Sequence, residues 1–261
     1  MKTALITGAS DGIGLELARE FAAKGHNLIL VARRLDRLNA LRQELTSRGG
    51  IAIHCIGLDL SQAGAAVQLY RQVQEIGLSV DYLVNNAGVG DYGPFAESDW
   101  DKTASMIELN MTTLTHITHL FLPAMMTRGG GRIMNVASTA AFQPGPRMAV
   151  YFATKAYVLH FSEALHHETH PKGVSVTALC PGPTRSGFVQ AMVDKGQNSP
   201  GLFRNKLIPD SAAVARYAYR AMMRGQAVAI HGLLNHFLAS TIGLFPRSLV
   251  VRISAALTRS N

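Results

Sequence analysis

Three residues in the second half of the chain have the types and the spacing needed to move a proton at a carbonyl or alcohol oxygen. Tyr151 and Lys155 are one helical turn apart, and Ser138 lies thirteen residues before the tyrosine. An i to i+4 spacing places both side chains on one helix face. The ordinary pKa of a phenol is about 10, and a neighbouring ammonium group is expected to lower it until proton exchange near neutral pH is feasible. A serine hydroxyl at the same point can hold the substrate oxygen.

A glycine-rich turn near the start of the chain predicts a nucleotide site. The apolar run 2–7 is typical of a buried strand, and residues 15–24 have the spacing of a helix that ends at Gly25. Between them the glycines follow G-x-x-x-G-x-G rather than the common G-x-G-x-x-G. Such a turn lets the backbone approach a pyrophosphate at the helix amino terminus; a turn without a ligand is the alternative, which the flanking strand and helix disfavour. The expected cofactor contacts here are Gly8, Ser10, Gly12, Ile13 and Gly14.

The end of the second predicted strand indicates which nucleotide is preferred. An acidic residue about 20 positions past the glycines would hold the ribose 2′-hydroxyl of NAD, but Ala32 stands there, followed by Arg33 and Arg34. Guanidinium groups can clamp a 2′-phosphate, so NADP(H) is the expected cofactor, with NAD(H) possible. Asp36 lies in the next amphipathic segment and is interpreted as a first-turn residue. The alternative for both arginines is a solvated helix start.

With Asn85-Asn86-Ala87-Gly88 between the glycine turn and Ser138, the chain resembles the short-chain dehydrogenase/reductase family from Lys2 to about Ile230. The resemblance implies that Asn110 holds a water in a proton relay with Ser138, Tyr151 and Lys155. It further implies four groups of cofactor contacts. The first two residues below contact adenine, the next three line the adenosine ribose, Tyr151 and Lys155 are the catalytic pair, and the last three belong to the segment after the sixth strand. These residues are Asp59, Leu60, Asn86, Ala87, Gly88, Tyr151, Lys155, Pro181, Gly182 and Thr184.

The segment after the sixth strand departs from the family pattern Pro-Gly-x-Val-x-Thr. Thr184 occupies the usual valine position and Ser186 the usual threonine position, so either hydroxyl could meet the nicotinamide carboxamide; Thr184 is preferred.

The function implied is hydride transfer between NADP(H) and a carbonyl or secondary alcohol. In the reductive direction Tyr151 protonates the alkoxide, Ser138 donates a hydrogen bond to it, and Lys155 holds the nicotinamide ribose. The expected activity is that of an NADPH-dependent carbonyl reductase. The alternative is a non-catalytic, nucleotide-sensing regulator, which would have no use for all four catalytic-type residues.

Alternating strand and helix patterns predict an α/β fold, a single doubly wound parallel sheet of the Rossmann type with helices on both faces. Strands are expected to begin near residues 2, 27, 51, 82, 132, 175 and 227. We expect residues 1–231 to form the dinucleotide-binding and catalytic domain and residues 232–261 a C-terminal helical extension, packed on that domain or at an interface.

Composition favours a cytoplasmic enzyme that needs no metal. The chain has 261 residues and is 48% hydrophobic, and its two cysteines, Cys55 and Cys180, are expected as buried thiols in a reducing compartment. The net charge of +8 lacks the basic stripe of a nucleic-acid-binding protein. His166 and His170 have the i, i+4 spacing of zinc helices but not the His-Glu-x-x-His order, so solvated histidines at a helix end are expected. A homodimer or homotetramer is implied by the resemblance.

Two segments are expected to determine specificity or partners. The irregular stretch 187–209, with Phe188 and Met192, is typical of a lid over the substrate, and Phe142, Met148 and Phe152 are candidates for the opposite wall. The substrate is then an apolar or bulky carbonyl compound; simple core packing is the alternative. Residues 232–261 combine apolar stretches with arginines. Packing on the domain, over the substrate mouth or against a partner subunit, is favoured over peripheral contact with lipid, and a membrane span is disfavoured.

Overall fold

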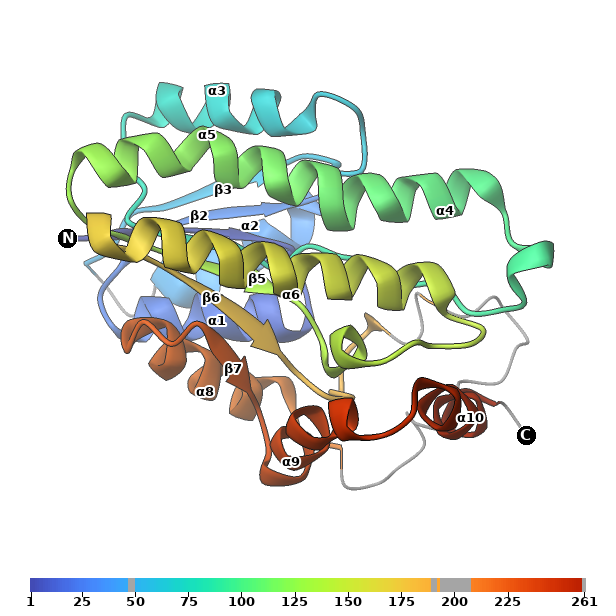
Figure 1. Cartoon of the computed structure of the whole chain (residues 1–261). Helices are drawn as coiled ribbons and strands as arrows, with labels where there is room; N and C mark the ends of the chain where they lie inside the picture. The colour runs from blue at the N-terminus through green and yellow to red at the C-terminus, as the bar shows by residue number, and fades with distance from the viewer. Residues whose placement is uncertain (47–49, 189–191, 193–207, 260–261) are drawn as a thin grey trace.

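The computed structural model describes residues 1–46, 50–188, 192 and 208–259. Within these residues, seven parallel strands form one sheet in the order β3-β2-β1-β4-β5-β6-β7 (Figure 1). The strands are β1 (Thr3–Thr7), β2 (Asn27–Ala32), β3 (Ile53–Gly57), β4 (Tyr82–Asn85), β5 (Gly131–Val136), β6 (Val174–Cys180) and β7 (Val228–Ile230). The order reverses between β1 and β4, and in open parallel sheets ligands bind beyond the carboxyl ends of the strands at such a point.

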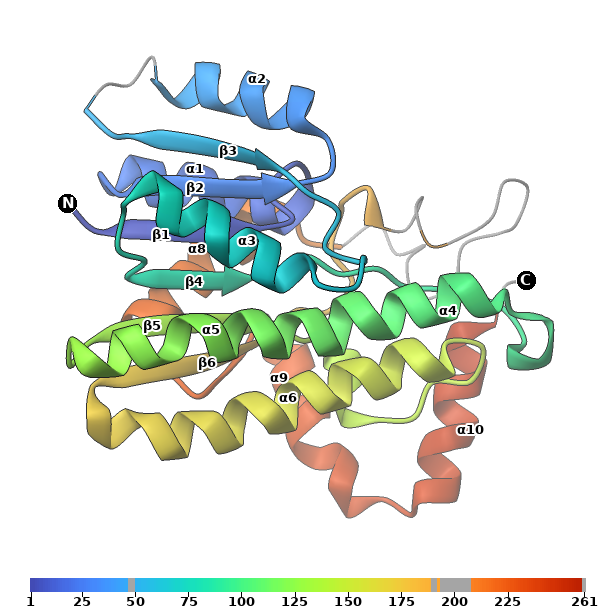
Figure 2. The same ribbon diagram turned by 90° about the horizontal axis from the view of Figure 1, so that it is seen from above.

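Helices cover both faces of the sheet, which confirms the predicted doubly wound arrangement (Figures 1 and 2). One face is covered by α1 (Gly12–Ala23), α2 (Leu35–Thr46) and α8 (Ser211–Met223), and the other by α3 (Ala65–Ile76), α5 (Leu114–Thr127) and α6 (Ala149–Thr169). β1 and β6 are buried along their whole lengths, because a parallel sheet that is covered on both faces leaves its central strands no solvent side. This explains why these strands are almost continuously apolar in sequence.

The long helical segment that follows the loop after β4 is interrupted by one π-helical turn. It begins as α4 (Trp100–Ile107), capped by the Asp99 carboxylate, which accepts from Asp101 N at 2.8 Å. It then forms a π-helical turn, η2 (Glu108–Thr113), before continuing as α5. Single π turns inside α-helices are frequent at functional sites, and this one carries Asn110.

The described chain ends in two short helices after β7. These are α9 (Leu233–Thr241) and α10 (Arg247–Thr258), joined through the 3-10 turn η6 (Ile242–Leu244). No helix among the described residues is long and apolar enough to cross a membrane.

The predicted strand starts agree with the structure within two residues. The first helix begins at Gly12 rather than at residue 15, because the Asp11 carboxylate caps it by accepting from Gly12 N at 2.7 Å.

Candidate active site

Ser138, Tyr151 and Lys155 come together beyond the carboxyl end of β5. Ser138 follows the strand directly and caps the 3-10 turn η3 (Thr139–Phe142), its Oγ accepting from Ala140 N at 3.1 Å. The Ser138 side chain lies near enough to the Tyr151 phenol to lower its pKa by hydrogen bonding. Lys155, one turn further along α6, has its Nζ 5.8 Å from the centre of the Tyr151 ring and donates to Val136 O at 2.8 Å. The three side chains that the sequence singled out are therefore neighbours in space.

Burial dominates the pKa values of this group. Tyr151 and Lys155 are only 8% and 5% exposed. Burial raises the pKa of Tyr151 to about 12, against the lowering effect of its bond with Ser138, and burial lowers the pKa of Lys155 to about 8. The expectation that the lysine lowers the phenol pKa is therefore not met by the protein alone, because loss of hydration disfavours the charged form of each group.

Asn110 joins the loop after β4 to α6. Its Oδ1 accepts from Val89 N at 3.0 Å, and its Nδ2 donates to Val89 O at 2.9 Å and to Thr154 Oγ1 at 3.1 Å. A Cβ added at Gly88 would lie 3.2 Å from Asn110 Oδ1 and 3.4 Å from Lys155 Nζ. Asn110 and Lys155 therefore both lie next to Gly88.

The glycine turn is bonded to the turn after β4. Asn86 Nδ2 donates to the carbonyls of Thr7 and Gly8, at 2.9 and 3.2 Å. Thr7 Oγ1 accepts from the amides of Asn86 and Ala87, both at 3.0 Å. The two predicted cofactor turns therefore form one unit, and the Asn86 amide group is used within the protein.

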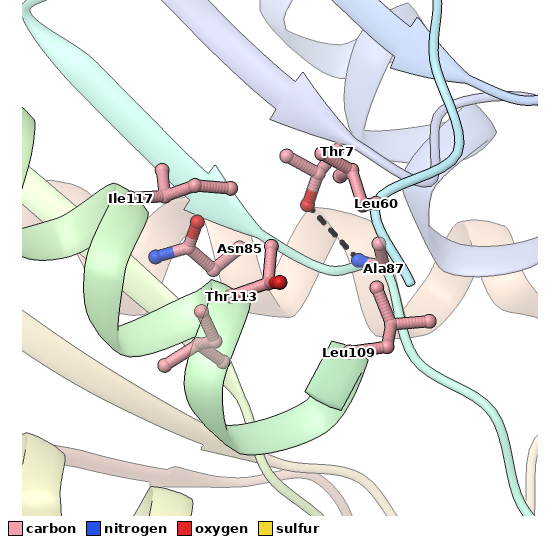
Figure 3. A pocket seen from close by; sticks show the side chains of 8 residues that line it. Thr7, Leu60, Asn85, Ala87, Leu109, Thr113 and Ile117 are labelled. Atoms are coloured by element: carbon pink, nitrogen blue, oxygen red, sulfur yellow. Dashed lines mark hydrogen bonds between the residues drawn. The ribbon is translucent and has the colours of Figure 1, made fainter. Parts of the chain in front are cut away.

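A small pocket lies beneath this unit, between β4 and the π turn. Figure 3 shows Thr7, Ala87 and Asn85 on its wall, with the Thr7–Ala87 hydrogen bond dashed. The pocket has room for about one water molecule, so it is not the substrate site. Asn85 Nδ2 donates to Thr118 Oγ1 and Asn135 Oδ1, both at 2.9 Å, and this buried pair of asparagines ties β4 to β5.

Arg34 is already directed toward the glycine turn. Its Nη2 donates to Ser10 Oγ at 3.3 Å and lies 3.6 Å from the Asp11 carboxylate, which Arg37 also approaches at 3.9 Å. Arg33 is exposed at the end of β2. Sequence reasoning missed Asp11, although an aspartate directly before a helix is a typical cap.

On the other side of Arg33, Asp59 follows β3. Partial burial opposes its ionisation, but hydrogen bonds from the backbone and side chain of Ser61 and the charge of Arg33 together lower the pKa of the carboxyl group. Leu60 is 4% exposed and lines the small pocket. Asp59 is thus held ionised beside the expected nucleotide site.

The segment after β6 passes both Ser138 and the glycine turn. Ser138 Oγ lies 3.4 Å from Pro181 O, and Thr184 Oγ1 donates to Gly182 O at 2.9 Å. Ser186 Cβ is 3.0 Å from where a Cβ on Gly12 would lie. Ser186 therefore contacts the glycine turn, whereas the Thr184 hydroxyl bonds within its own loop.

Apolar side chains pack around the ring of Tyr151. The ring of Phe188 lies 5.6 Å from that of Tyr151 and the ring of Phe152 lies 6.1 Å away, and Met148 and Met192 complete the cluster. Residues 189–191 and 193–207 of the predicted lid lie outside the described residues. Phe142 does not belong to this wall: the turn of η3 directs it into a separate cluster with Val228 and Ile230.

Tyr92 is a further member of this cluster that sequence reasoning missed. It is 6% exposed, its hydroxyl donates to Thr258 O at 2.8 Å, and it accepts from Arg147 Nη1 at 3.2 Å. Arg147 has a φ of 66°, the left-handed conformation that residues other than glycine seldom adopt. No local sequence signal links residues 92 and 258.

The described residues contain no group of three or more His, Cys, Asp or Glu side chains that could hold a metal ion. His166 is not the solvated side chain that was expected, because its Nδ1 contacts Val176 O at 2.7 Å in the neighbouring strand β6. Cys55 and Cys180 are free thiols; Cys180 is buried and Cys55 half-buried.

The donor set fits a nicotinamide dinucleotide. The first turn of α1 offers backbone amides without helical acceptors, and Gly8 and Gly12 have φ values of 67° and 54°. The exposed Arg33 and Arg34 supply positive charge at the end of β2. Lys155, which donates to the end of β5, and Tyr151 lie on the other side of the β1–β4 switch point, where a dinucleotide is bound in such sheets.

Residues 2–197 match the family model described as short chain dehydrogenase. A very-long-chain 3-oxoacyl-CoA reductase of Pyrenophora tritici-repentis is 33% identical over 251 residues, which cover 92% of this chain and 72% of that protein. Among solved structures, a short-chain dehydrogenase from Sphingobium yanoikuyae in complex with NADPH is 31% identical with a TM-score of 0.81, covering 94% of this chain and 95% of the other. The bulky-bulky ketone specific alcohol dehydrogenase from Comamonas testosteroni is 31% identical with a TM-score of 0.78, covering 94% and 93%.

Proposed function

The chain belongs to the short-chain dehydrogenase family and is an oxidoreductase of alcohol or carbonyl groups, and from this premise we propose that it is an NADPH-dependent carbonyl reductase. The observation that carries the proposal is the meeting of Ser138, Tyr151 and Lys155 beside Asn110, at the carboxyl ends of β4 and β5. Chemistry at a C=O or C–OH group needs one proton donor and one hydrogen-bond donor at the same oxygen, and this cluster supplies both.

NADPH is preferred over NADH in this proposal because of charge at the end of β2. Arg33 and Arg34 directly follow Ala32, which stands where an acidic residue would select NAD, and Arg34 is held at Ser10 beside the glycine turn. The Sphingobium relative was solved with NADPH, which supports the same preference. Gly8, Gly12 and Gly14 admit the pyrophosphate, and Asp59 and Ala87 flank the adenosine.

The bound nicotinamide would supply the hydride, and the residues of this chain handle the oxygen and the proton. Ser138 donates a hydrogen bond to the substrate oxygen, and Tyr151 gives it a proton as it becomes an alcohol. Lys155 holds the nicotinamide ribose, and its charge beside the phenol ring stabilises the phenolate that remains. Asn110, bonded to Val89 and Thr154, positions the route by which the proton returns.

The substrate is an apolar or bulky ketone or aldehyde. Phe188, Phe152, Met148 and Met192 form the wall next to Tyr151 and offer only apolar surface to the reacting group. This choice is supported by a structural relative named for bulky ketones, which is 31% identical, and by a sequence relative named for very-long-chain 3-oxoacyl-CoA, which is 33% identical. We further propose that the enzyme works in the cytoplasm as a homodimer or homotetramer, with residues 1–231 as its catalytic domain.

Calorimetric titration with NADPH and with NADH, followed by turnover assays on a ketone panel, tests the proposal. We expect NADPH to bind at least about tenfold more tightly, which corresponds to about 1.4 kcal/mol, and absorbance at the NADPH band to fall when a bulky ketone is added. Equal affinities would remove the cofactor assignment. Tight nucleotide binding without turnover of any carbonyl or alcohol would contradict the catalytic proposal.

A further inference from the structure

The two C-terminal helices expose large apolar side chains to solvent. The most exposed are Leu233, at 93%, and Leu244, at 82%. We call the whole set the outer apolar face; it comprises Leu233, Leu234, Phe237, Leu238, Leu244, Phe245, Leu249, Ile253 and Leu257. These residues come from α9, η6, the turn after it and α10, which Figure 2 shows as two arms joined at one end. An apolar patch that extends over two helices of a water-exposed surface marks an interaction site.

The inner sides of the same helices are small or polar, which reverses the usual arrangement of a surface helix. In α10 the buried positions are Val250, Ser254 and Thr258, at i, i+4 and i+8, while Ile253 and Leu257 point outward at 53% exposure each. α9 has no buried residue at all. Within the part of the chain that the structure describes, these leucines and phenylalanines therefore remain largely open to solvent.

The helices are nevertheless attached to the body of the molecule. The Thr258 carbonyl accepts from the buried Tyr92 hydroxyl at 2.8 Å. A side chain on Gly182 would collide with Asn235 of α9, so that helix lies directly against the loop after β6. The outer apolar face is thus a fixed surface next to the substrate side of the site.

The charged side chains of the C-terminal segment have one sign. No aspartate or glutamate follows Asp210 in the sequence, whereas Arg247, Arg252 and Arg259 lie on or beside α10 and are exposed. In a two-fold contact between copies of the chain, a patch meets its own equivalent, so these arginines would approach each other without acidic partners from the same segment. An anionic lipid surface matches both the apolar side chains and the positive charge.

We propose that the outer apolar face docks on an anionic lipid bilayer, with α9 and α10 lying in the headgroup region. The apolar side chains enter the acyl boundary, and Arg247, Arg252 and Arg259 contact lipid phosphates. Binding is peripheral, because neither helix is long enough to span. Since α10 is bonded to Tyr92 of the cluster around Tyr151, docking turns the substrate side of the site toward the membrane.

Vesicle flotation of the full-length protein tests this proposal. We expect the protein to float with phosphatidylcholine vesicles that contain phosphatidylglycerol, and to bind at least about tenfold less to pure phosphatidylcholine, because the exposed arginines are attracted to an anionic surface. The variant L234S/F237S/L257S should lose binding to both. The control F95S/W100S removes two apolar side chains of similar exposure, 63% and 68%, outside the tail and should float normally.

A second readout does not depend on the stability of the serine variant. The chain has one tryptophan, Trp100, so W100F/F237W carries its only indole on the outer apolar face. We expect its emission to shift to the blue with anionic vesicles and to be quenched by brominated acyl chains.

Failure of the unmodified protein to float, or an unquenched indole at position 237, overturns the proposal. If the unmodified protein does not bind vesicles and L234S/F237S/L257S has half its mass in solution, the face forms contacts between copies instead. None of these outcomes depends on catalysis, so they are separate from tests of the carbonyl reductase proposal.

Discussion

The amine of Lys155 and the ring of Tyr151 are held 5.8 Å apart inside the protein, and each is buried before any ligand arrives. Burial moves their pKa values in opposite directions, to about 8 for the lysine and about 12 for the tyrosine. In the protein alone the phenol therefore stays neutral near pH 7, and there is little ionic attraction between the two side chains. Proton transfer by Tyr151 then depends on what else enters the site.

This arrangement predicts a pH dependence of stability. Because folding lowers the pKa of Lys155 from 10.5 to about 8, the native state binds fewer protons than the unfolded chain between those values. Stability from this group therefore rises with pH through that window and is lost as pH falls through about 8. Lys155→Met, which has no amine to charge, should lack this slope.

Urea unfolding at several pH values measures the effect. From about pH 7 to about pH 9.5, the free energy of unfolding of the unmodified protein should gain about 2 kcal/mol relative to Lys155→Met. Lys172→Met, at an exposed lysine, should keep the pH dependence of the unmodified protein. Parallel curves for the unmodified protein and Lys155→Met would show that burial does not shift this amine.

Removal of the Tyr151 hydroxyl should abolish turnover without weakening cofactor binding. Tyr151→Phe keeps the ring that packs against Phe188 but has no proton to give, and a general acid contributes about 10²- to 10⁴-fold to rate. Steady-state kinetics and NADPH titration measure the two effects separately. Tyr157→Phe on the same helix loses a hydroxyl that contacts only Thr115 on the helix surface among the bonds described, and should remain active. Full activity in Tyr151→Phe would exclude the proposed acid.

The two arginines after β2 should determine selectivity between the nucleotides. Arg33→Ala is expected to weaken NADPH binding by about 1.5 to 3 kcal/mol, the worth of a charge-assisted hydrogen bond, and to leave NADH binding nearly unchanged. Arg34→Ala should do the same and also loosen the glycine turn, because Arg34 bonds Ser10. Arg37→Ala is the matched control, since the ion pair described for that residue is a 3.9 Å contact with Asp11. Equal losses for both nucleotides would remove the 2′-phosphate role.

Gly14 should be intolerant of any side chain. A Cβ there would collide with the Gly8 carbonyl and the Asn86 side chain, so both cofactor turns would have to move. We expect Gly14→Ala to lower the free energy of unfolding by about 1–3 kcal/mol and to weaken nucleotide binding. Gly130→Ala meets no atom within 4 Å and should be nearly neutral. Comparable thermal unfolding of the two variants would contradict the packing described.

Phe188 should limit substrate size. Phe188→Ala opens space next to Tyr151 and should raise kcat/KM for a bulky ketone about tenfold relative to a small one, within the range that a few methylene groups can supply. Phe95→Ala, at an exposed position that does not belong to that cluster, should leave the ratio as it is. A ratio unchanged by Phe188→Ala would place the substrate elsewhere.

The fold was largely readable from sequence because its signals are local. Buried strands such as Thr3–Thr7 and glycines at fixed offsets leave short patterns, and the strand starts agree within two residues. Spacing likewise identified Tyr151 and Lys155, because four residues along a helix return to the same face.

Other features depend on contacts between distant segments and have no local pattern. The bond between Tyr92 and Thr258 joins residues far apart in sequence. The direction of Phe142 depends on the turn of η3, which rotates it away from Tyr151 toward β7. The pKa of Tyr151 depends on how completely the fold excludes water from it, which a spacing rule cannot supply.

The π turn at Glu108–Thr113 constrains how this part of the chain can change over evolutionary time. Such a turn holds one residue more than the α-helical turn it replaces. Loss of that residue would leave α4 and α5 as good helices, yet it would rotate one relative to the other by about 100°. Either Asn110 would leave Val89, or α5 would present another side to the sheet. In an alignment of functional descendants, this stretch should accept exchanges of amino acids but neither gaps nor insertions.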